Sequence, residues 1–139
     1  MKQQSGFTLI ELIAVIVILG ILAATAIPKF VDLSEAAKEA STQGVAGALG
    51  SAAALNHAST IAKDAGLTAT NPVPITIGDC TAVGPLLEGD LPDNYVIVAN
   101  PITAEAIVEC TVTYDKNDNG TVDTEDTVSA SFTAFGDTP

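Results

Sequence analysis

The sequence predicts an α+β fold in which one long N-terminal helix packs on a small antiparallel β-sheet. Two observations lead to this fold class. The first half of the chain is an apolar, alanine-rich pattern with helical spacing, and the second half holds short alternating runs separated by prolines. A length of 139 residues favours one compact domain. The order of helix first and sheet afterwards is typical of an α+β protein.

The net charge argues against one large class of partner. The chain has 5 Lys and Arg residues against 17 Asp and Glu, a formal charge of −12, and it contains no arginine. Phosphate backbones are bound by clustered cations, so we expect no direct nucleic-acid binding. The sequence also lacks a phosphate-cradling glycine loop and a supported Ser/His/Asp or Cys/His set, and we therefore do not expect an enzyme.

The N-terminal apolar segment runs from Phe7 to Ile27 and contains one charged residue, Glu11. As a helix it would reach about 31 Å, the thickness of a bilayer's hydrocarbon core. Residues 1–6 carry Lys2 and should stay cytoplasmic under the positive-inside rule. The segment is therefore predicted to cross a membrane once, with the rest of the chain exported.

Two simple interpretations of this segment leave features unexplained. A secretory signal could be cleaved near residues 24–26, but signal peptides have shorter apolar regions without an internal acid. A plain membrane anchor would give Glu11 no partner, although a carboxylate inside a spanning helix costs roughly 2.5–3.5 kcal/mol. A third interpretation supplies that partner.

The third interpretation starts from the run Gly6-Phe7-Thr8-Leu9-Ile10-Glu11, which is followed by unbroken apolar residues and a proline. This run resembles the class III signal of type IV pilins and pseudopilins. The resemblance implies that a prepilin peptidase removes residues 1–6 as a leader peptide and N-methylates Phe7. Residues 7–28 would then form the transmembrane and filament-core half of the helix. Within the family, the sequence is most similar to pilins of the mannose-sensitive haemagglutinin type.

The predicted cleavage gives Glu11 a partner. A new ammonium group at Phe7 of a neighbouring copy would neutralise the carboxylate and set the axial stagger between copies. Removing one member of such a buried pair costs roughly 3–5 kcal/mol. The alternative is that Glu11 snorkels to the interface or stays protonated.

The helix is predicted to continue well beyond the apolar segment. Gly20 and Pro28 mark a soft interval where we expect a kink or local loss of helix. Residues 29–66 resume the helical pattern, which gives a total length of about 90 Å, too long for this domain to cover. The first half should therefore pack against other chains. Ala, Gly and Ser dominate residues 36–54 and allow close approach, either to other chains or to the chain's own sheet.

Residues 67–139 hold most of the prolines and form the predicted sheet region. The predicted strands are Pro74–Ile77, Tyr95–Ala99, Ala106–Tyr114 and Thr127–Phe135. In the last two runs, apolar residues alternate with polar ones, so one face of each strand should be buried on the helix.

Cys80 and Cys110 are the only cysteines. The predicted topology places both on the oxidising side of the membrane, so we expect a disulfide. On the chain-entropy model, closing a loop of about 30 residues stabilises the domain by roughly 3–4 kcal/mol. A metal site built on two cysteines would lack further soft ligands. His57 is the only histidine, and we expect it to be an ordinary polar helix residue.

The acidic loop, residues 115–126, has the spacing of an EF-hand calcium loop. Its predicted ligands are Asp115, Asn117, Asn119, Thr121, Asp123 and Asp126. Gly120 occupies the sixth position, where the loop turns sharply. Two departures are a shorter acid at the last position and flanking strands in place of helices. We therefore expect a static structural calcium site rather than a sensor; the alternative is a solvated polar turn.

Together these features predict the major subunit of a type IV pilus. The subunit would be inserted in the inner membrane by its helix. The pilus assembly machinery would then stack it with copies of itself into an extracellular filament for adhesion, surface colonisation or motility. One alternative is a major pseudopilin of a type II secretion system. Another is a membrane-anchored calcium-binding module that never polymerises.

Overall fold

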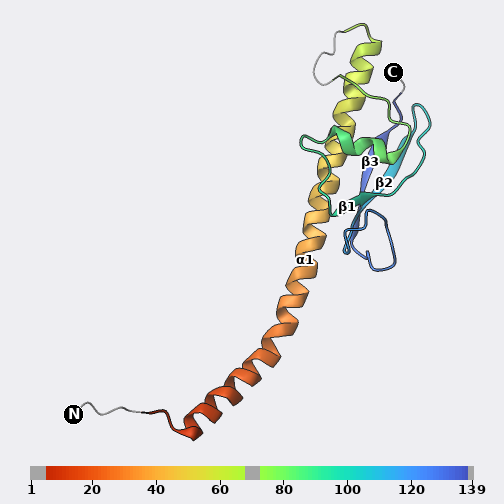
Figure 1. The fold of residues 1–139 in the computed structure, drawn as a ribbon. Helices are drawn as coiled ribbons and strands as arrows, with labels where there is room; N and C mark the ends of the chain where they lie inside the picture. Colours follow the sequence, from red (N-terminus) through yellow and green to blue (C-terminus); the bar gives the residue numbers. More distant parts are fainter. Residues whose placement is uncertain (1–5, 68–72, 138–139) are drawn as a thin grey trace. The chain divides into compact units, whose positions relative to one another are not determined.

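The computed structural model describes residues 6–67 and 73–137, with backbone alone for residues 26–32. The elements in order are α1 (Leu9–Asp64), the 3-10 helix η1 (Cys80–Leu86), β1 (Tyr95–Ile97), β2 (Ile107–Tyr114) and β3 (Ser129–Phe135) (Figure 1). This long helix and small antiparallel sheet confirm the predicted α+β class. The chain divides into two compact units, Met1–Ala37 and Lys38–Pro139.

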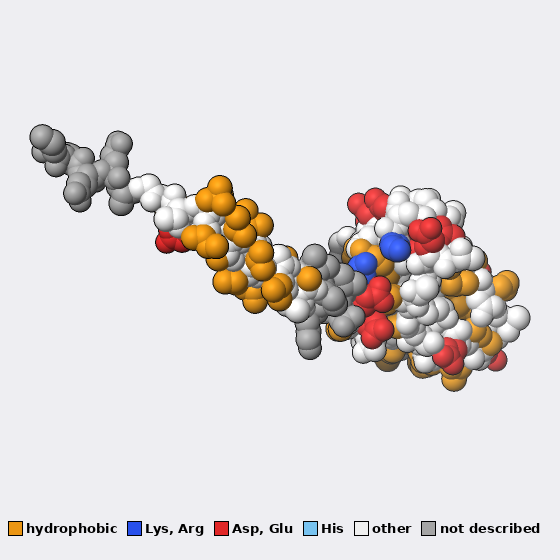
Figure 2. Space-filling model, turned by 90° about the horizontal axis from the view of Figure 1, so that it is seen from below, with side chains coloured by type: hydrophobic (Ala, Val, Ile, Leu, Met, Phe, Trp, Pro, Cys, Tyr) orange, Lys and Arg blue, Asp and Glu red, His pale blue; other side chains and the backbone are white. Residues whose placement is uncertain are grey.

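The first unit is the N-terminal part of α1. Helix is assigned without a break through Gly20 and Pro28, so the predicted loss of helix is absent from the single chain, while the predicted bend stays a prediction. The side chains of residues 7–25 are all exposed, and Figure 2 shows an orange apolar surface on the visible face of this helix segment. A fully apolar helix surface needs a partner in another molecule or a lipid phase.

In the second unit, α1 ends where the sequence places a glycine. Gly66 has a positive φ of 79°, and its N–H donates to Lys63 O at 2.9 Å. The next N–H, of Leu67, donates to Ala62 O at 2.9 Å. These two bonds form a Schellman cap, which satisfies the last carbonyls of the helix. The predicted helix end near Gly66 is thus confirmed.

The sheet has the order β1-β2-β3, with both pairs antiparallel. Tyr95 lies opposite Tyr114, and Cys110 lies opposite Phe132. The predicted inward residues form the core together with α1 and η1. Thr113, assigned to the solvent face, is buried as well, and it lies between Val96 and Ser129 on the two neighbouring strands.

The predicted disulfide between Cys80 and Cys110 is present, with the two Cα atoms 5.7 Å apart. Both cysteines are buried, so the bond joins η1 to the central strand inside the core.

The second half of α1 packs on the chain's own sheet through one stripe of its small residues. Leu49 is fully buried, flanked by the buried Ala46 and Ala53. A Cβ built on Gly50 would lie 3.7 Å from the Cβ of Phe132, so the helix and β3 make ordinary contact there. Gly47 remains exposed on the adjoining side of the helix. The small residues therefore serve the chain's own sheet, while a second stripe stays uncovered in the single chain.

The prediction of a strand at Pro74–Ile77 is wrong. The described residues there form one isolated bridge, Ile77 to Asp137. At Ile75, a side chain takes the place of a strand partner. Asn56 Nδ2 donates to Ile75 O and Asn56 Oδ1 accepts from Ile75 N, both at 2.9 Å. The helix thus satisfies this backbone, and no ladder is needed.

Candidate functional site

The first candidate site is the start of α1, where Thr8 and Glu11 bind each other. Glu11 Oε2 accepts from the backbone N–H and the hydroxyl of Thr8, and Glu11 N–H donates to Thr8 Oγ1, each at 3.3 Å. This reciprocal arrangement is a capping box. It holds the carboxylate at the positive end of the helix dipole. Sequence reasoning missed this pairing, although the Thr-x-x-Glu spacing indicates it.

The predicted cleavage residues lie just before the helix. Gly6 is exposed and the Phe7 side chain is 88% exposed. A Cβ on Gly20 would meet nothing within 4 Å, and the side chain of Pro28 lies outside the described residues. Among the parts of the chain described here, no helix combines the length and apolarity required to cross a bilayer.

The second candidate site is the acidic loop, which turns around Asp115. This side chain is only 2% exposed. Its Oδ1 accepts from the N–H of Asn117 at 3.2 Å and its Oδ2 accepts from the N–H of Gly120 at 2.7 Å. Gly120 has φ of 73°, a left-handed conformation that costs glycine little. The first and sixth positions of the loop are therefore in direct contact.

The remaining predicted ligands join the same network. Asp123 Oδ2 accepts from the side-chain amides of Asn117 at 2.8 Å and Asn119 at 3.2 Å. Asn119 Oδ1 accepts from the N–H of Thr121 at 2.8 Å. Asp126 accepts from the N–H groups of Lys116 at 2.8 Å and Asp123 at 3.0 Å.

Hydrogen bonds also stabilise the charge of one loop carboxylate. The Glu125 N–H, and after it the Asn117 amide, hold the pKa of Asp123 below its ordinary value. Asp123 is therefore ionised throughout the neutral range, as a metal ligand needs to be.

The donors of the loop fit calcium in kind. Carboxylates and side-chain amides supply the hard oxygen ligands that this ion prefers, and none of the predicted ligands is a cysteine or histidine. In the described residues, however, no three His, Cys, Asp or Glu side chains are placed together as a metal-holding group. The predicted ligands instead bond one another and the loop backbone.

The prediction that His57 is an ordinary polar residue is wrong. Its Nδ1 lies 2.6 Å from Asp137 Oδ1, and its ring stacks on Phe135 with centroids 4.6 Å apart. Asp137 is buried, and its second oxygen accepts from Asn56 Nδ2 at 2.9 Å. These residues tie the end of β3 to α1. The partners are 80 positions apart in sequence, so no local pattern indicates them.

Comparison with known proteins identifies a sequence motif at the start of the chain. Residues 1–27 match the model of the prokaryotic N-terminal methylation motif. The chain is 56% identical over 53 residues to the type IV narrow pilus major component PilA5 of Thermus thermophilus, covering 38% of this chain and 46% of that protein.

Two further relatives come from Pseudomonas aeruginosa. The type II secretion system core protein G is 57% identical over 37 residues, covering 27% of this chain and 26% of that protein. A fimbrial protein is 66% identical over 32 residues, covering 23% and 21%. The chain thus matches less than half the length of each of these relatives. No solved structure matches it.

Proposed function

We propose that this protein, whose N-terminal segment is that of a type IV pilin with its class III signal, is the major structural subunit of a type IV pilus. The single observation that carries the proposal is the methylation motif over residues 1–27 combined with 56% identity to a pilus major component. The exposed apolar surface of the first unit supports it, because polymerisation through α1 would cover that surface. The role is structural rather than catalytic.

The proposed assembly uses the groups at the start of α1. Cleavage after Gly6 turns the Phe7 N–H into an ammonium group. In the precursor, Thr8 satisfies the Glu11 carboxylate; in the filament, the ammonium of a neighbouring copy would bind it. The exchange of a local partner for an intermolecular one would let the single chain exist in the inner membrane before assembly. The filament would serve adhesion, surface colonisation or motility.

The test is a Glu11→Ala variant of the full precursor, compared with Glu35→Ala. We expect normal membrane insertion and processing of both, with filaments lost only for Glu11→Ala. Mass spectrometry of wild-type filaments should find a methylated Phe7 as first residue. Filaments that still carry residues 1–6, or full assembly of Glu11→Ala, would contradict the proposal.

The second candidate is a major pseudopilin of a type II secretion system, favoured by the 57% identity to core protein G. Purified surface filaments decide between the two. Long extracellular fibres built of this chain support the pilin, whereas a chain confined to the periplasm supports the pseudopilin. A membrane-anchored module that never polymerises is the third possibility, and any fibre of this chain excludes it.

We also propose that the acidic loop binds calcium as a structural ion. Asp115, Asp123 and Asp126 would supply carboxylates, and Asn117, Asn119 and Thr121 would supply neutral oxygens. The ion would relieve the repulsion between acids that now rely on N–H donors. Isothermal titration of the detergent-solubilised chain with Ca²⁺ should show binding that Asp123→Asn weakens and Glu88→Gln does not. Equal binding by both variants would contradict this site.

A further inference from the structure

One edge of the sheet is open along the whole of β3. Tyr114 N–H donates to Val128 O and Gly136 N–H donates to Ala106 O, both at 2.8 Å, so even-numbered residues of this segment bond towards β2. The backbone groups of Ser129, Ser131 and Thr133 must then point to the opposite side. The carbonyl of Asp137, two positions beyond Phe135 in this odd-numbered series, accepts from Ile77 N–H on that side. Among the described residues, no backbone partner is found for the three others.

This edge has none of the usual protections. Proteins guard free edges with charged residues, proline or bulges, because an open row of N–H and C=O groups pairs readily with another chain. The β3 sequence, SASFTAF, contains no charge and no proline. The strand has seven residues, so the unprotected edge is long compared with the three-residue strand β1 on the other side of the sheet.

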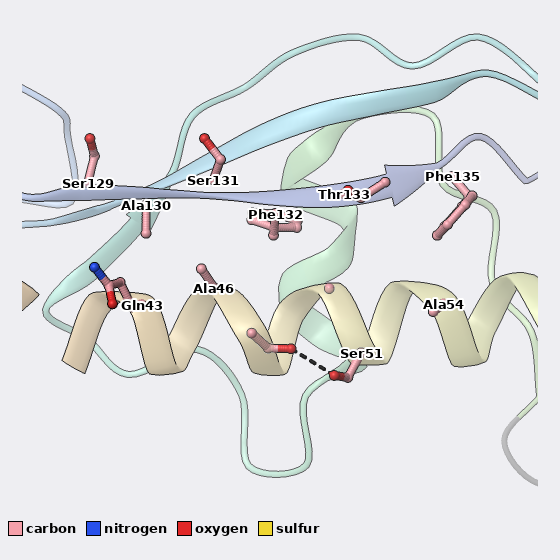
Figure 3. Close-up of a pocket in the computed structure, with 12 residues that line it drawn as sticks. Gln43, Ala46, Ser51, Ala54, Ser129, Ala130, Ser131, Phe132, Thr133 and Phe135 are labelled. Atoms are coloured by element: carbon pink, nitrogen blue, oxygen red, sulfur yellow. Dashed lines mark hydrogen bonds between the residues drawn. The ribbon is translucent and has the colours of Figure 1, made fainter. Parts of the chain in front are cut away.

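A groove of about 850 Å³ lies between this edge and α1 (Figure 3). Its floor on the helix consists of Gln43 and a row of small residues, among them Gly47 and Ser51, and its strand side includes Phe132 and Phe135. A strand added next to β3 would place alternate side chains over this floor. The small residues leave room for large ones.

The backbone decides the shape of the occupant. Covering the edge without pairing its N–H and C=O groups would cost free energy for each buried group. A helix satisfies its own backbone and would leave the edge unpaired, whereas an extended segment pairs with it. The occupant is therefore extended.

The net charge of residues 38–139 indicates the chemistry of the segment that pairs with β3. Only Glu11, Asp32 and Glu35 of the 17 acidic residues lie outside residues 38–139, and that unit has only Lys38, Lys63 and Lys116 as cations. Figure 2 shows red side chains spread over its visible face. Glu109 lies directly opposite Thr133 in the sheet and is exposed, close to the edge. The net acidic charge of this unit favours a cationic segment at the edge.

We propose that the free edge of β3 and the groove beneath it bind an extended segment of another protein, rich in β-branched residues and carrying lysine or arginine, by strand addition. This function goes beyond polymerisation through α1 and does not depend on it.

The test uses the full chain in detergent micelles and a labelled nine-residue peptide with alternating threonine and valine between terminal lysines. Fluorescence anisotropy measures binding. Two matched peptides serve as controls: one ends in glutamates, and one has alternate backbone amides N-methylated on the pairing side. We expect each change to weaken binding by about tenfold or more.

Two protein variants locate the site. Ser131→Pro removes an outward N–H but no bond to β2. Ser51→Leu fills the groove without touching the strand, so it keeps the test valid if Ser131→Pro fails to fold. Both should weaken binding by about tenfold, whereas Ala48→Leu, outside the groove, should not. Hydrogen exchange should show new protection at Ser131 and Thr133 in the wild-type complex.

Three results would overturn the proposal. The first is no binding of the lysine peptide at millimolar concentration. The second is equal binding of the glutamate or N-methylated peptide, or of the Ser51→Leu variant. The third is concentration-dependent protection of Ser131 and Thr133 without peptide, which would assign the edge to a second copy of this chain.

Discussion

At the scale of single residues, Asn56 connects three parts of the molecule. It lies on α1, pairs with both backbone groups of Ile75, and donates to the buried carboxylate of Asp137. An asparagine at this helix position is indistinguishable from a solvated polar residue in the sequence. Its three bonds are visible only because two distant segments meet there.

Replacing this residue gives the first prediction. Asn56→Ala leaves Ile75 and the buried Asp137 without these partners, and each lost hydrogen bond costs about 0.5–1.5 kcal/mol. We expect the free energy of unfolding to fall by about 2–4 kcal/mol, measured by chemical denaturation. Ser59→Ala, at a half-buried residue on the same helix whose hydroxyl bonds only Leu55 O, is the control and should change it by less than about 0.5 kcal/mol. Equal effects of the two changes would contradict the role of Asn56.

Gly136 gives a second prediction at this scale. A Cβ there would lie 2.0 Å from Thr103 O, a backbone atom that cannot swing aside, whereas a Cβ on Gly78 would meet nothing within 4 Å. Gly136→Ala should therefore destabilise the fold by about 1–3 kcal/mol, and Gly78→Ala should not. Thermal unfolding followed by circular dichroism measures both. A melting temperature unchanged in Gly136→Ala would show that the 103–106 segment can move away.

At the scale of elements, α1 shows where local signals suffice. Its start is set by the Thr8–Glu11 capping box and its end by Gly66, and both signals are local in sequence. The proline-containing interval is helical in the single chain even though a proline disfavours it. Loss of helix there, if it occurs in a filament, would require contacts with other copies.

Removing the cap gives the third prediction. Thr8→Ala deletes the hydroxyl that donates to the Glu11 carboxylate and accepts from the Glu11 N–H. Losing such a cap lowers the stability of a helix by about 1 kcal/mol. Amide exchange in the first turn of α1 should accelerate about fivefold in the detergent-solubilised precursor. Thr25→Ala, which removes only a bond to Leu22 O, should leave that turn unchanged. Unchanged exchange in Thr8→Ala would mean that the cap does not form.

At the scale of the whole molecule, the core is small and the disulfide is its cross-link. Cys80 and Cys110 are separated by 30 residues in sequence and lie among the buried residues of η1 and β2. The paired variant Cys80→Ala/Cys110→Ala should lower the free energy of unfolding by about 3–4 kcal/mol relative to the oxidised protein. Urea denaturation with and without reductant measures this. An equal stability of reduced and oxidised protein would contradict it.

The sequence by itself determined the fold class, the ends of α1, the positions of three strands and the cysteine pair. These follow from patterns within a few residues or, for the cysteines, from having a single possible partner. Only the tertiary structure decided that Asn56 replaces the strand predicted at Pro74–Ile77, that His57 binds Asp137, and that β3 is an open edge. Such facts depend on which segments meet across the core, and contacts between residues far apart in the chain leave no periodic signal in it.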